Sequence, residues 1–200
     1  MDIRQIKHTL RDHEMENISE ARVVQAAVLV PLVERDGVPH ILFEERNSTI
    51  PQGGEICFPG GHVEDGEAPE DAALRETSEE LLVDPRQIEL VAPLHCLRAN
   101  GAREIRSFLG VLRDYAGTWE ADEVARTFLL PVEWLRQRPP EIYEGRIVNA
   151  LGDDFPYELI PGGRDYPFAS GVHRFYFYRT EYGVIWGLTA QLLYHFLKLL

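Results

Sequence analysis

A mixed α/β sandwich is the fold class that the sequence predicts, and three observations support it. Short apolar, β-branched runs recur along the chain with only a few helical segments between them. No internal repeat, low-complexity tract or linker interrupts this pattern. The 200 residues, of which 44% are hydrophobic, suffice for one sizeable core. We therefore expect residues 1–200 to form a single domain around a mixed sheet, without the regular βαβ units of a doubly wound sheet.

The first part of the chain predicts a helix followed by a β-hairpin. Apolar residues at helical spacing indicate an amphipathic helix over 3–12, within an N-terminal extension of residues 1–20. The apolar run 23–33 predicts a strand, and the sequence Glu-Arg-Asp-Gly at 34–37 predicts a turn. The pattern then resumes as a second strand over 40–45.

A glycine-containing loop and an acidic helix come next. The polar segment 47–54 predicts a loop, and 55–58 predicts a short strand that Pro59-Gly60-Gly61 should break. The segment 69–82 has a helical pattern. Pro69 suits its first turn, where the missing N–H of proline has no helical partner to lose.

The remaining elements follow from alternating apolar runs and one apolar C-terminal segment. The predicted strands lie at 88–97, 103–112, 128–131, 142–150 and 173–180. A short helix is expected at 132–137, and a closing helix over 188–200 is entered at residue 187, so that 187–200 form the C-terminal helix. This helix is apolar enough for the core or for the interface of a homodimer, and we favour the core.

Charge and composition exclude several classes of protein. The chain has 33 Asp and Glu against 20 Lys and Arg, and this acidity argues against nucleic acid as a partner. Two cysteines exclude a disulfide scaffold and a four-cysteine zinc site. The longest apolar stretch has eight residues, whereas a membrane helix needs roughly 20. The charged N-terminus does not resemble a signal peptide, so we expect a cytoplasmic protein without a membrane partner.

More than half of the formal net charge of −13 is concentrated in residues 61–83, which hold eight acidic side chains and one basic residue, Arg75. On a helical wheel, Glu76, Glu79 and Glu80 fall within one arc. Like charges three or four residues apart destabilise a helix by roughly 0.2–0.5 kcal/mol per pair. A solvated helix face would normally interleave lysines, and this segment has none.

Two interpretations of this acidic arc stay open at this point. Leu74 and Leu81 lie nearly opposite the carboxylates, which indicates that one side of the helix packs inward while an acidic side faces solvent. The same oxygen-rich side could instead hold a hard divalent cation, Mg²⁺ or Mn²⁺. Gly60 and Gly61, just before it, let the backbone approach an ion or a phosphate closely.

The segment 61–83 resembles the Nudix box, whose pattern is G-x5-E-x7-R-E-U-x-E-E-x-G-U. Thr77 stands at the aliphatic position and Val83 closes the match. Six glycine and polar positions agree with the pattern: Gly61, Glu67, Arg75, Glu76, Glu79 and Glu80. The spacing of all six makes a chance match very rare.

Leu82 departs from the pattern, because it stands where the family has glycine. That glycine ends the helix in the left-handed conformation. A leucine in this conformation costs on the order of 1–2 kcal/mol, so we expect the helix to end in another way. Leu82 lies beyond the carboxylates, and we expect activity to be retained.

The Nudix resemblance implies an α/β/α sandwich in which the box forms a loop, a helix and a loop. It also implies a hydrolase that splits the diphosphate of a substituted nucleoside diphosphate with water, using metal ions to offset phosphate charge. The implied metal ligands are Gly60, Glu76, Glu79 and Glu80. Arg75 and Glu79 are implied as catalytic, with Arg75 orienting a carboxylate, whereas Gly61 and Glu67 have supporting roles.

Residues 41–61 resemble a narrower pattern, the coenzyme A diphosphatase signature LLTxRSxxx(R/K)xxxGxxxFPGG. The FPGG ending matches in full, and Gly54 falls at the signature glycine. Arg46 is one position late, and Ile50 occupies the second basic position. The resemblance implies substrate binding by Arg46 and Gly54, and coenzyme A or an acyl-coenzyme A as the substrate. The implied products are 3′,5′-ADP and 4′-phosphopantetheine or its acyl form.

An acidic turn before the strand at 128–131 is a second candidate region. Some members of the family recruit a Glu from this region as a metal ligand or general base. We favour Glu123 for this role, with Glu120 and Asp122 as alternatives. The competing interpretation is an exposed acidic turn without a function.

Two other features have simpler explanations that we prefer. Cys57 fits a small buried hydrophobic residue better than a nucleophile, because no histidine or other base adjoins it. The alternation of residues 175–178 puts two Phe on one strand face and two Tyr on the other. The Tyr pair could stack on a base, but strand aromatics more often belong to the core.

Three functions follow from these patterns. The first is hydrolysis of coenzyme A or its thioesters with Mg²⁺ or Mn²⁺. The second is hydrolysis of another nucleoside diphosphate derivative, such as ADP-ribose, NADH or a nucleotide sugar, which the changes at Arg46 and Ile50 motivate. The third is a domain that binds a nucleotide or a partner without catalysis. Retention of the box carboxylates argues against this third function.

Overall fold

The computed structural model describes residues 23–99 and 103–200, and the helix predicted over 3–12 lies outside them. The described strands are β1 (Val24–Arg35), β2 (Val38–Arg46), β3 (Ile56–Cys57), β4 (Gly60–His62), β5 (Ile88–Ala99), β6 (Arg103–Leu112), β7 (Val124–Pro131), β8 (Glu141–Ile147), β9 (Gly171–Thr180) and β10 (Gly183–Trp186). The described α-helices are α2 (Pro69–Leu81), α3 (Val132–Arg136) and α4 (Gly187–Leu197). Short 3₁₀ helices occupy Pro85–Gln87, Tyr157–Leu159 and Gly163–Asp165.

A seven-stranded mixed sheet forms the centre of the molecule. Its main path runs β3-β2-β1-β6-β5, with β4 paired to β1 and β7 paired to β2. The pairing of β1 with β6 is parallel, whereas the other pairs in this sheet are antiparallel. A second, three-stranded sheet has the order β10-β9-β8. The sequence patterns predicted eight of these strands, but not β4 or β10 and not the division into two sheets.

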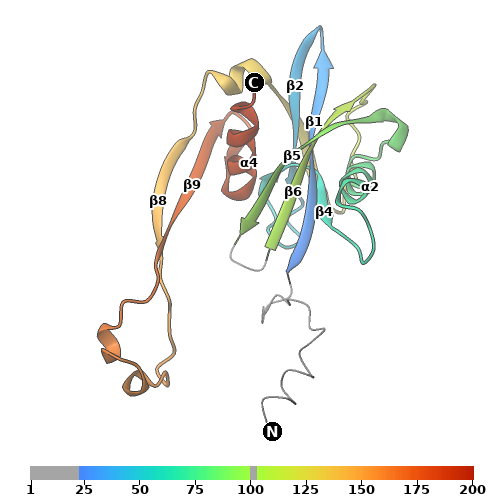
Figure 1. Ribbon diagram of the computed structural model, residues 1–200. Helices are drawn as coiled ribbons and strands as arrows, with labels where there is room; N and C mark the ends of the chain where they lie inside the picture. The colour runs from blue at the N-terminus through green and yellow to red at the C-terminus, as the bar shows by residue number, and fades with distance from the viewer. Residues whose placement is uncertain (1–22, 100–102) are drawn as a thin grey trace, which may run out of the picture.

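Helices cover both faces of the seven-stranded sheet, which confirms the predicted α/β sandwich. Figure 1 shows α2 on one side of the sheet and α4 on the other, where β9 also lies. Each face has its own hydrophobic cluster. The cluster on the α2 side includes Leu42 and Leu81, and the cluster on the α4 side includes Phe43 and Leu193. Leu42 and Phe43 belong to different clusters because successive strand residues point to opposite faces.

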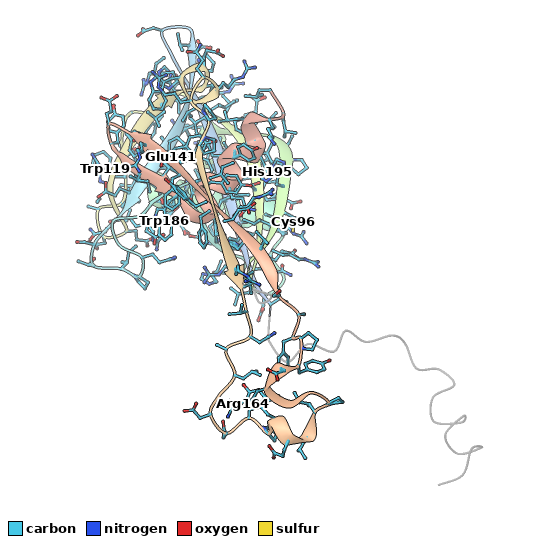
Figure 2. All side chains as sticks on the ribbon, turned by 90° about the vertical axis from the view of Figure 1, so that its left-hand side faces the viewer. Cys96, Trp119, Glu141, Arg164, Trp186 and His195 are labelled. Carbon is cyan, nitrogen blue, oxygen red and sulfur yellow. The ribbon has the colours of Figure 1, made fainter. Side chains whose placement is uncertain are left out.

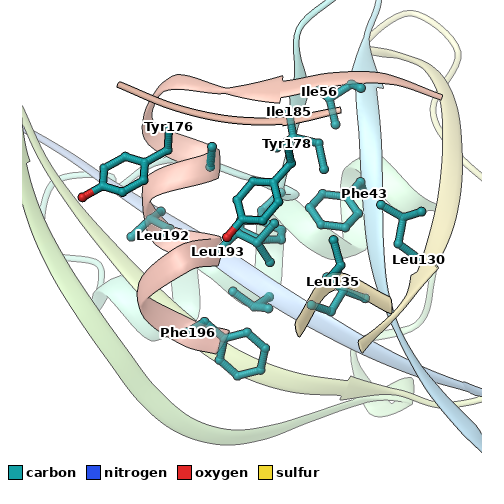
Figure 3. Close-up of a cluster of buried hydrophobic side chains, with 14 of the residues drawn as sticks. Phe43, Ile56, Leu130, Leu135, Tyr176, Tyr178, Ile185, Leu192, Leu193 and Phe196 are labelled. Carbon is teal, nitrogen blue, oxygen red and sulfur yellow. The ribbon is translucent and has the colours of Figure 1, made fainter. Parts of the chain in front are cut away.

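The α4 side is an aromatic and aliphatic core. Figure 3 shows Phe43 and Tyr178 near Leu193 of α4, and all three residues are at most 3% exposed. Tyr176 is also buried. The predicted core roles of the closing helix and of the tyrosine pair are therefore confirmed, whereas Phe175 on the opposite strand face is exposed.

The β8–β9 pair continues away from the sandwich, and residues 148–170 form the far end of this extension (Figure 1). In Figure 2, Arg164 marks that end, distant from the body of the molecule. The predicted strand over 142–150 stops at Ile147. No helix among residues 23–99 and 103–200 is long and apolar enough to cross a membrane.

Two strand starts near the acidic helix differ from the sequence pattern. The short strand β3 ends at Cys57, before the Pro-Gly-Gly segment, as predicted, but a further strand that was not predicted, β4, begins at Gly60 and pairs with β1. The predicted start of the next strand at Phe128 was wrong, because β7 begins four residues earlier at Val124 and pairs with β2. Pairing with a neighbouring strand determines both starts, and local composition does not reveal it.

Candidate active site

The acidic helix α2 begins and ends with recognisable signals. Pro69 occupies the first turn, and Glu70 and Asp71 lie there too, where acidic side chains complement the positive end of the helix dipole. At the other end, Leu82 has φ 51° and ψ 49° and its N–H donates to the carbonyl of Ser78. The helix therefore ends in the left-handed conformation after all, and our expectation that Leu82 would avoid it was wrong.

Contacts on either side of Leu82 explain this conformation. Leu81 and Val83 are both buried in the cluster under α2, whereas the Leu82 side chain is 54% exposed. The hydroxyl of Thr118 donates to the Leu81 carbonyl over 2.7 Å. Burial of both neighbours requires a sharp reversal between them, and the fold imposes it on a leucine despite the local strain.

The inward face of α2 contains a carboxylate. Its buried residues are Ala72, Ala73, Thr77, Glu80 and Leu81. Glu80 is only 3% exposed, whereas the side chains of Glu76 and Glu79 are 18% and 62% exposed. The three box carboxylates do share one arc, but this arc overlaps the packed face. Our expectation of an acidic side opposite the core was wrong.

Arg75 gathers the other carboxylates of the segment. Its Nε donates to Glu67 Oε1 over 2.9 Å, and its Nη1 contacts Glu76 Oε1 at 2.9 Å and Glu79 Oε2 at 3.3 Å. Its Nη2 donates to the carbonyl of His62 and to Glu67 Oε2. The Arg75 guanidinium holds the pKa of Glu67 below its usual range. Arg75 therefore contacts Glu67, Glu76 and Glu79 at once.

Gly60 and Gly61 are required by close approaches. The N–H of Gly60 donates to Glu80 Oε2 over 2.8 Å, and its φ of 147° is one that side chains rarely allow. A Cβ on Gly61 would lie 2.4 Å from the carboxyl carbon of Glu76. The backbone of this turn thus touches two of the three box carboxylates, and larger residues would displace them.

A buried carboxylate on the sheet, Glu44, was not among the sequence candidates. It is 1% exposed on β2, where the thiol of Cys57 donates to its Oε1 over 3.3 Å. Burial, followed by the nearby charge of Glu44, raises the pKa of Glu80 to about 9, and burial raises the pKa of Glu44 to about 7. A glutamate directly after the apolar run Ile41-Leu-Phe was the available signal, but the sequence pattern alone gives it no role beyond a place in the predicted strand 40–45.

Cys57 is half-buried, and its environment disfavours a thiolate. Burial and the adjoining Glu44 raise the pKa of the Cys57 thiol well above its usual value. The thiol donates a hydrogen bond and stays protonated near neutral pH. The sequence pattern did not reveal the carboxylate that adjoins Cys57.

The loop with Arg46 and Gly54 lies beside the turn that carries Glu123. Asn47 links the two segments, because its backbone N–H donates to the Glu123 carbonyl and its side-chain amide donates to the Ala121 carbonyl. Arg46 donates from Nε to the carbonyl of Pro51 at the start of the same loop. The Glu123 side chain is exposed. Its charge raises the pKa of Glu44, whereas the charge of Arg46 lowers it.

The same turn is tied to the end of α2. The N–H of Glu120 donates to the backbone carbonyl of Glu80 over 2.8 Å, and the N–H groups of Glu123 and Val124 donate to the carbonyl of Glu120. Residues from α2, β2 and the turn before β7 therefore meet at one end of the sandwich. The structure brings together Arg46, Glu80 and Glu123, which are distant in the sequence.

The donor set of this region suits a hard divalent cation. It consists of carboxylate and backbone oxygens, and one oxygen of the buried Glu44 has no hydrogen-bond partner. Within residues 23–99 and 103–200, no three Asp, Glu, His or Cys side chains are already arranged to hold a metal ion. Glu76 and Glu79 are instead paired with Arg75.

The fold is a mixed-sheet sandwich, and one of its faces carries an acidic loop and helix whose carboxylates contact Arg75. This combination is the one expected for the family whose box the sequence resembles. The NUDIX domain model matches residues 23–149. The chain therefore belongs to the Nudix hydrolase family, as its box indicates.

Two individual proteins of this family are similar to the chain. The chain is 31% identical to the peroxisomal coenzyme A diphosphatase NUDT7 of Mus musculus over 132 residues, which cover 64% of this chain and 55% of that protein. It thus spans about half the length of this relative. It is 30% identical to the uncharacterized Nudix hydrolase NudL of Cronobacter sakazakii over 173 residues, covering 84% of this chain and 79% of the relative.

Solved structures support the fold. The crystal structure of the Nudix hydrolase RenU from M. Smegmatis matches with a TM-score of 0.50 and 20% identity, over 58% of this chain and 75% of that one. At this level of identity the likeness concerns the fold alone.

Proposed function

We propose that the chain hydrolyses the diphosphate bond of coenzyme A or an acyl-coenzyme A to 3′,5′-ADP and (acyl-)4′-phosphopantetheine. The observation that carries the proposal is the meeting of the α2 carboxylates with the Gly60-Gly61 turn, where Glu80 and Glu76 touch backbone that has no room for a side chain. The coenzyme A part is supported by the upstream signature and by the similarity to the mouse coenzyme A diphosphatase.

Divalent cations, Mg²⁺ or Mn²⁺, would be held by Glu76, Glu79, Glu80 and the carbonyl of Gly60. When bound there, such ions offset the charge of the diphosphate and lower the pKa of a coordinated water. The residues of the chain do the positioning. The hydrogen bond from the Gly60 N–H fixes Glu80, and Gly61 leaves space for the Glu76 carboxylate.

Arg75 and Glu67 have complementary roles in this proposal. Arg75 orients Glu79 and Glu76 through Nη1, and Glu67 holds the guanidinium in place through two hydrogen bonds. When a cation takes up the box carboxylates, Glu67 keeps Arg75 ordered beside them. Glu123 is proposed as the base that accepts a proton from the attacking water, because it is exposed next to this group.

Arg46 and Gly54 are proposed to contact the substrate. The N–H of Gly54 donates to the carbonyl of Arg46, so the loop forms a closed turn whose exposed side could meet a phosphate. Gly54 has φ 81°, and a Cβ there would meet open space, so only backbone conformation restricts this position. We place the protein in the cytoplasm, because two cysteines that form no disulfide fit that compartment.

The test is a substrate panel with product identification. Purified protein with Mg²⁺ or Mn²⁺ should convert coenzyme A to 3′,5′-ADP and 4′-phosphopantetheine, as seen by mass spectrometry. Glu79→Gln should abolish conversion, whereas Glu70→Gln should not, because Glu70 is an exposed carboxylate in the first turn of the same helix. Absence of 3′,5′-ADP with either metal would refute the coenzyme A proposal.

The second candidate is hydrolysis of another nucleoside diphosphate derivative, and Ile50 favours it. Ile50 lies in the loop where the coenzyme A signature has a base that would suit the 3′-phosphate. Equal kcat/KM for coenzyme A and dephospho-coenzyme A would show that the 3′-phosphate is not recognised. A higher kcat/KM for ADP-ribose, NADH or a nucleotide sugar would favour the second candidate.

A further inference from the structure

Glu44 is the most deeply buried carboxylate near the site, and half of its hydrogen-bonding capacity is unused. Its side chain is 1% exposed, Oε1 accepts from the Cys57 thiol, and Oε2 has no hydrogen-bond partner. A buried polar atom without a partner costs free energy comparable to a lost hydrogen bond, and more for a charged group. The position therefore requires an explanation beyond packing.

The alternation along β2 shows where Glu44 points. Leu42 packs in the cluster under α2, and Phe43 packs in the cluster on the α4 side. Two residues after Leu42, Glu44 faces α2 as well. In the sheet, Glu44 is paired with Cys57 of β3 and with Thr127 of β7, so strands flank it on both sides. Its carboxylate is thus directed to the interface between the sheet and the acidic helix.

The helix presents Glu80 to the same interface. Glu80 is also buried, and the nearby charges of Glu44 and Glu76 both act on its carboxylate. Charged groups that face Glu44 come from three elements: Arg46 on its own strand, Glu76 and Glu80 on α2, and Glu123 before β7. Acids outnumber the single base, and Arg46 directs its Nε to the carbonyl of Pro51. Two buried carboxylates at one interface are compatible only if a proton or a cation lies with them.

We propose that Glu44 is an additional ligand of the divalent cation, contributing Oε2 from the sheet opposite Glu80 of the helix. The cation class is the one that oxygen donors select, Mg²⁺ or Mn²⁺. This inference rests on the proposed metal site of α2 and adds a ligand from outside the box. It explains both the buried unpartnered oxygen and the thiol hydrogen bond, since Cys57 fixes Oε1 and leaves Oε2 free.

The test measures Mn²⁺ binding directly, by electron paramagnetic resonance of free Mn²⁺ in a titration without substrate. Glu44→Gln keeps the shape and the capacity to accept from Cys57 but removes the charge. We expect Mn²⁺ binding at least tenfold weaker than in the wild type, or the loss of one bound ion. Two matched controls should stay within threefold of the wild type: Glu45→Gln, the next residue on the strand, and Cys57→Ser.

The outcomes separate this inference from the function proposed above. Wild-type affinity and stoichiometry in Glu44→Gln, with weakened binding in Glu80→Gln, would overturn the inference and leave the box site intact. Mn²⁺ binding that depends on Glu44 in a protein that does not cleave coenzyme A would refute the proposed substrate and support the inference. Should Glu44→Gln not fold, Glu44→Asp replaces it: at least fivefold weaker binding supports the inference, and wild-type binding overturns it.

Discussion

The two faces of the seven-stranded sheet use the same strands for opposite purposes. On the α4 face, Phe43 stacks on Phe58 and Phe128 with ring centroids 5.1 and 5.7 Å apart, and the cluster consists of aromatic and aliphatic side chains. On the α2 face, the next residue of β2 is the buried acid Glu44, and the helix above it contributes Glu80.

This difference shows which face sustains the fold and which face carries the chemistry. Apolar surface buried on the α4 side contributes about 25 cal/mol per Å². Buried carboxylates on the α2 side oppose folding unless a proton or a cation accompanies them. The two buried carboxylates break local rules of stability on the α2 face, as is expected at a functional site. The predictions below change one face at a time.

The largest effect is expected for Glu80→Gln on the α2 face. Loss of a metal-ligating charge removes several kcal/mol of transition-state stabilisation, about a 10³-fold fall in kcat/KM. The metal-free protein should at the same time melt at a higher temperature. Burial raises the pKa of Glu80 to about 9, so folding near neutral pH requires this carboxyl to take up a proton, whereas the amide needs none and can still accept from the Gly60 N–H. The measurements are steady-state hydrolysis and thermal unfolding with a chelator.

The informative contrast is the sign of the two effects. Activity and stability should move in opposite directions in Glu80→Gln. A variant that loses both would show that Glu80 is a structural residue, and one that keeps full activity would remove it from the metal site.

Leu193→Ala on the α4 face should lower the stability of the protein and leave its activity nearly unchanged. Leu193 is fully buried among the residues drawn in Figure 3, and such truncations cost about 2–5 kcal/mol because a cavity remains. We expect the free energy of unfolding to fall by about 3 kcal/mol and kcat/KM to change less than twofold where the variant is folded. Urea unfolding and hydrolysis at 20 °C check this, with exposed Leu199→Ala as the control. A large fall in kcat/KM of the folded variant would couple the two faces.

The two faces also differed in how well they could be predicted from sequence. The α4 face follows from apolar periodicity, which placed the closing helix and the Tyr176–Tyr178 pair in the core. The family follows from the spacing of the box. The gathering of Glu67, Glu76 and Glu79 around Arg75 was not predicted as a set and is visible only in the structure. The inward position of Glu80 does not follow from the wheel, since the direction of the core depends on how the helix sits on the sheet.

The remaining differences between prediction and structure arise from strand pairings between segments that are distant in the sequence. Glu44 approaches α2 only because β2, β3 and β7 pair, and none of these pairings is visible in the local pattern. The same holds for β4, whose start at Gly60 depends on pairing with β1. The glycines that follow β3 are also required by contacts to Glu76 and Glu80, which the local pattern does not reveal.

The stability of the metal-free protein should depend on pH, and this effect, of intermediate size, should distinguish the two faces. The pKa of Glu44 rises from 4.5 to about 7 in the folded state through burial. The folded state therefore holds its proton more tightly than the unfolded state, so stability is fully present below pH 4.5 and falls as pH rises toward 7. For one such group the loss between pH 5 and pH 7 is about 2 kcal/mol.

Urea unfolding with a chelator at pH 5, 6 and 7 measures this loss. In Glu44→Gln the fall should be clearly smaller than in the wild type, because the variant lacks both this carboxyl and the charge that helps raise the pKa of Glu80. Leu193→Ala should keep the wild-type slope. The charges that face Glu44, namely Arg46, Glu76, Glu80 and Glu123, remain in both variants. Equal slopes in Glu44→Gln and the wild type would mean that Glu44 is not protonated preferentially in the folded protein.

The smallest effect is expected at Leu82, where the strain is confined to the backbone of one residue at the end of α2. Its φ of 51° is imposed by the burial of Leu81 and Val83, and its own side chain is 54% exposed. Leu82→Gly relieves a left-handed penalty of about 1–2 kcal/mol but gives the unfolded chain more freedom, at a cost of about 0.5–1 kcal/mol. We expect a net gain of about 0.5–1 kcal/mol in urea unfolding and unchanged kcat/KM. Leu82→Ala retains a Cβ and the strain, so it should not stabilise the protein. Stabilisation of equal size in both variants would instead assign the gain to removal of an exposed apolar side chain, because only glycine relieves the backbone.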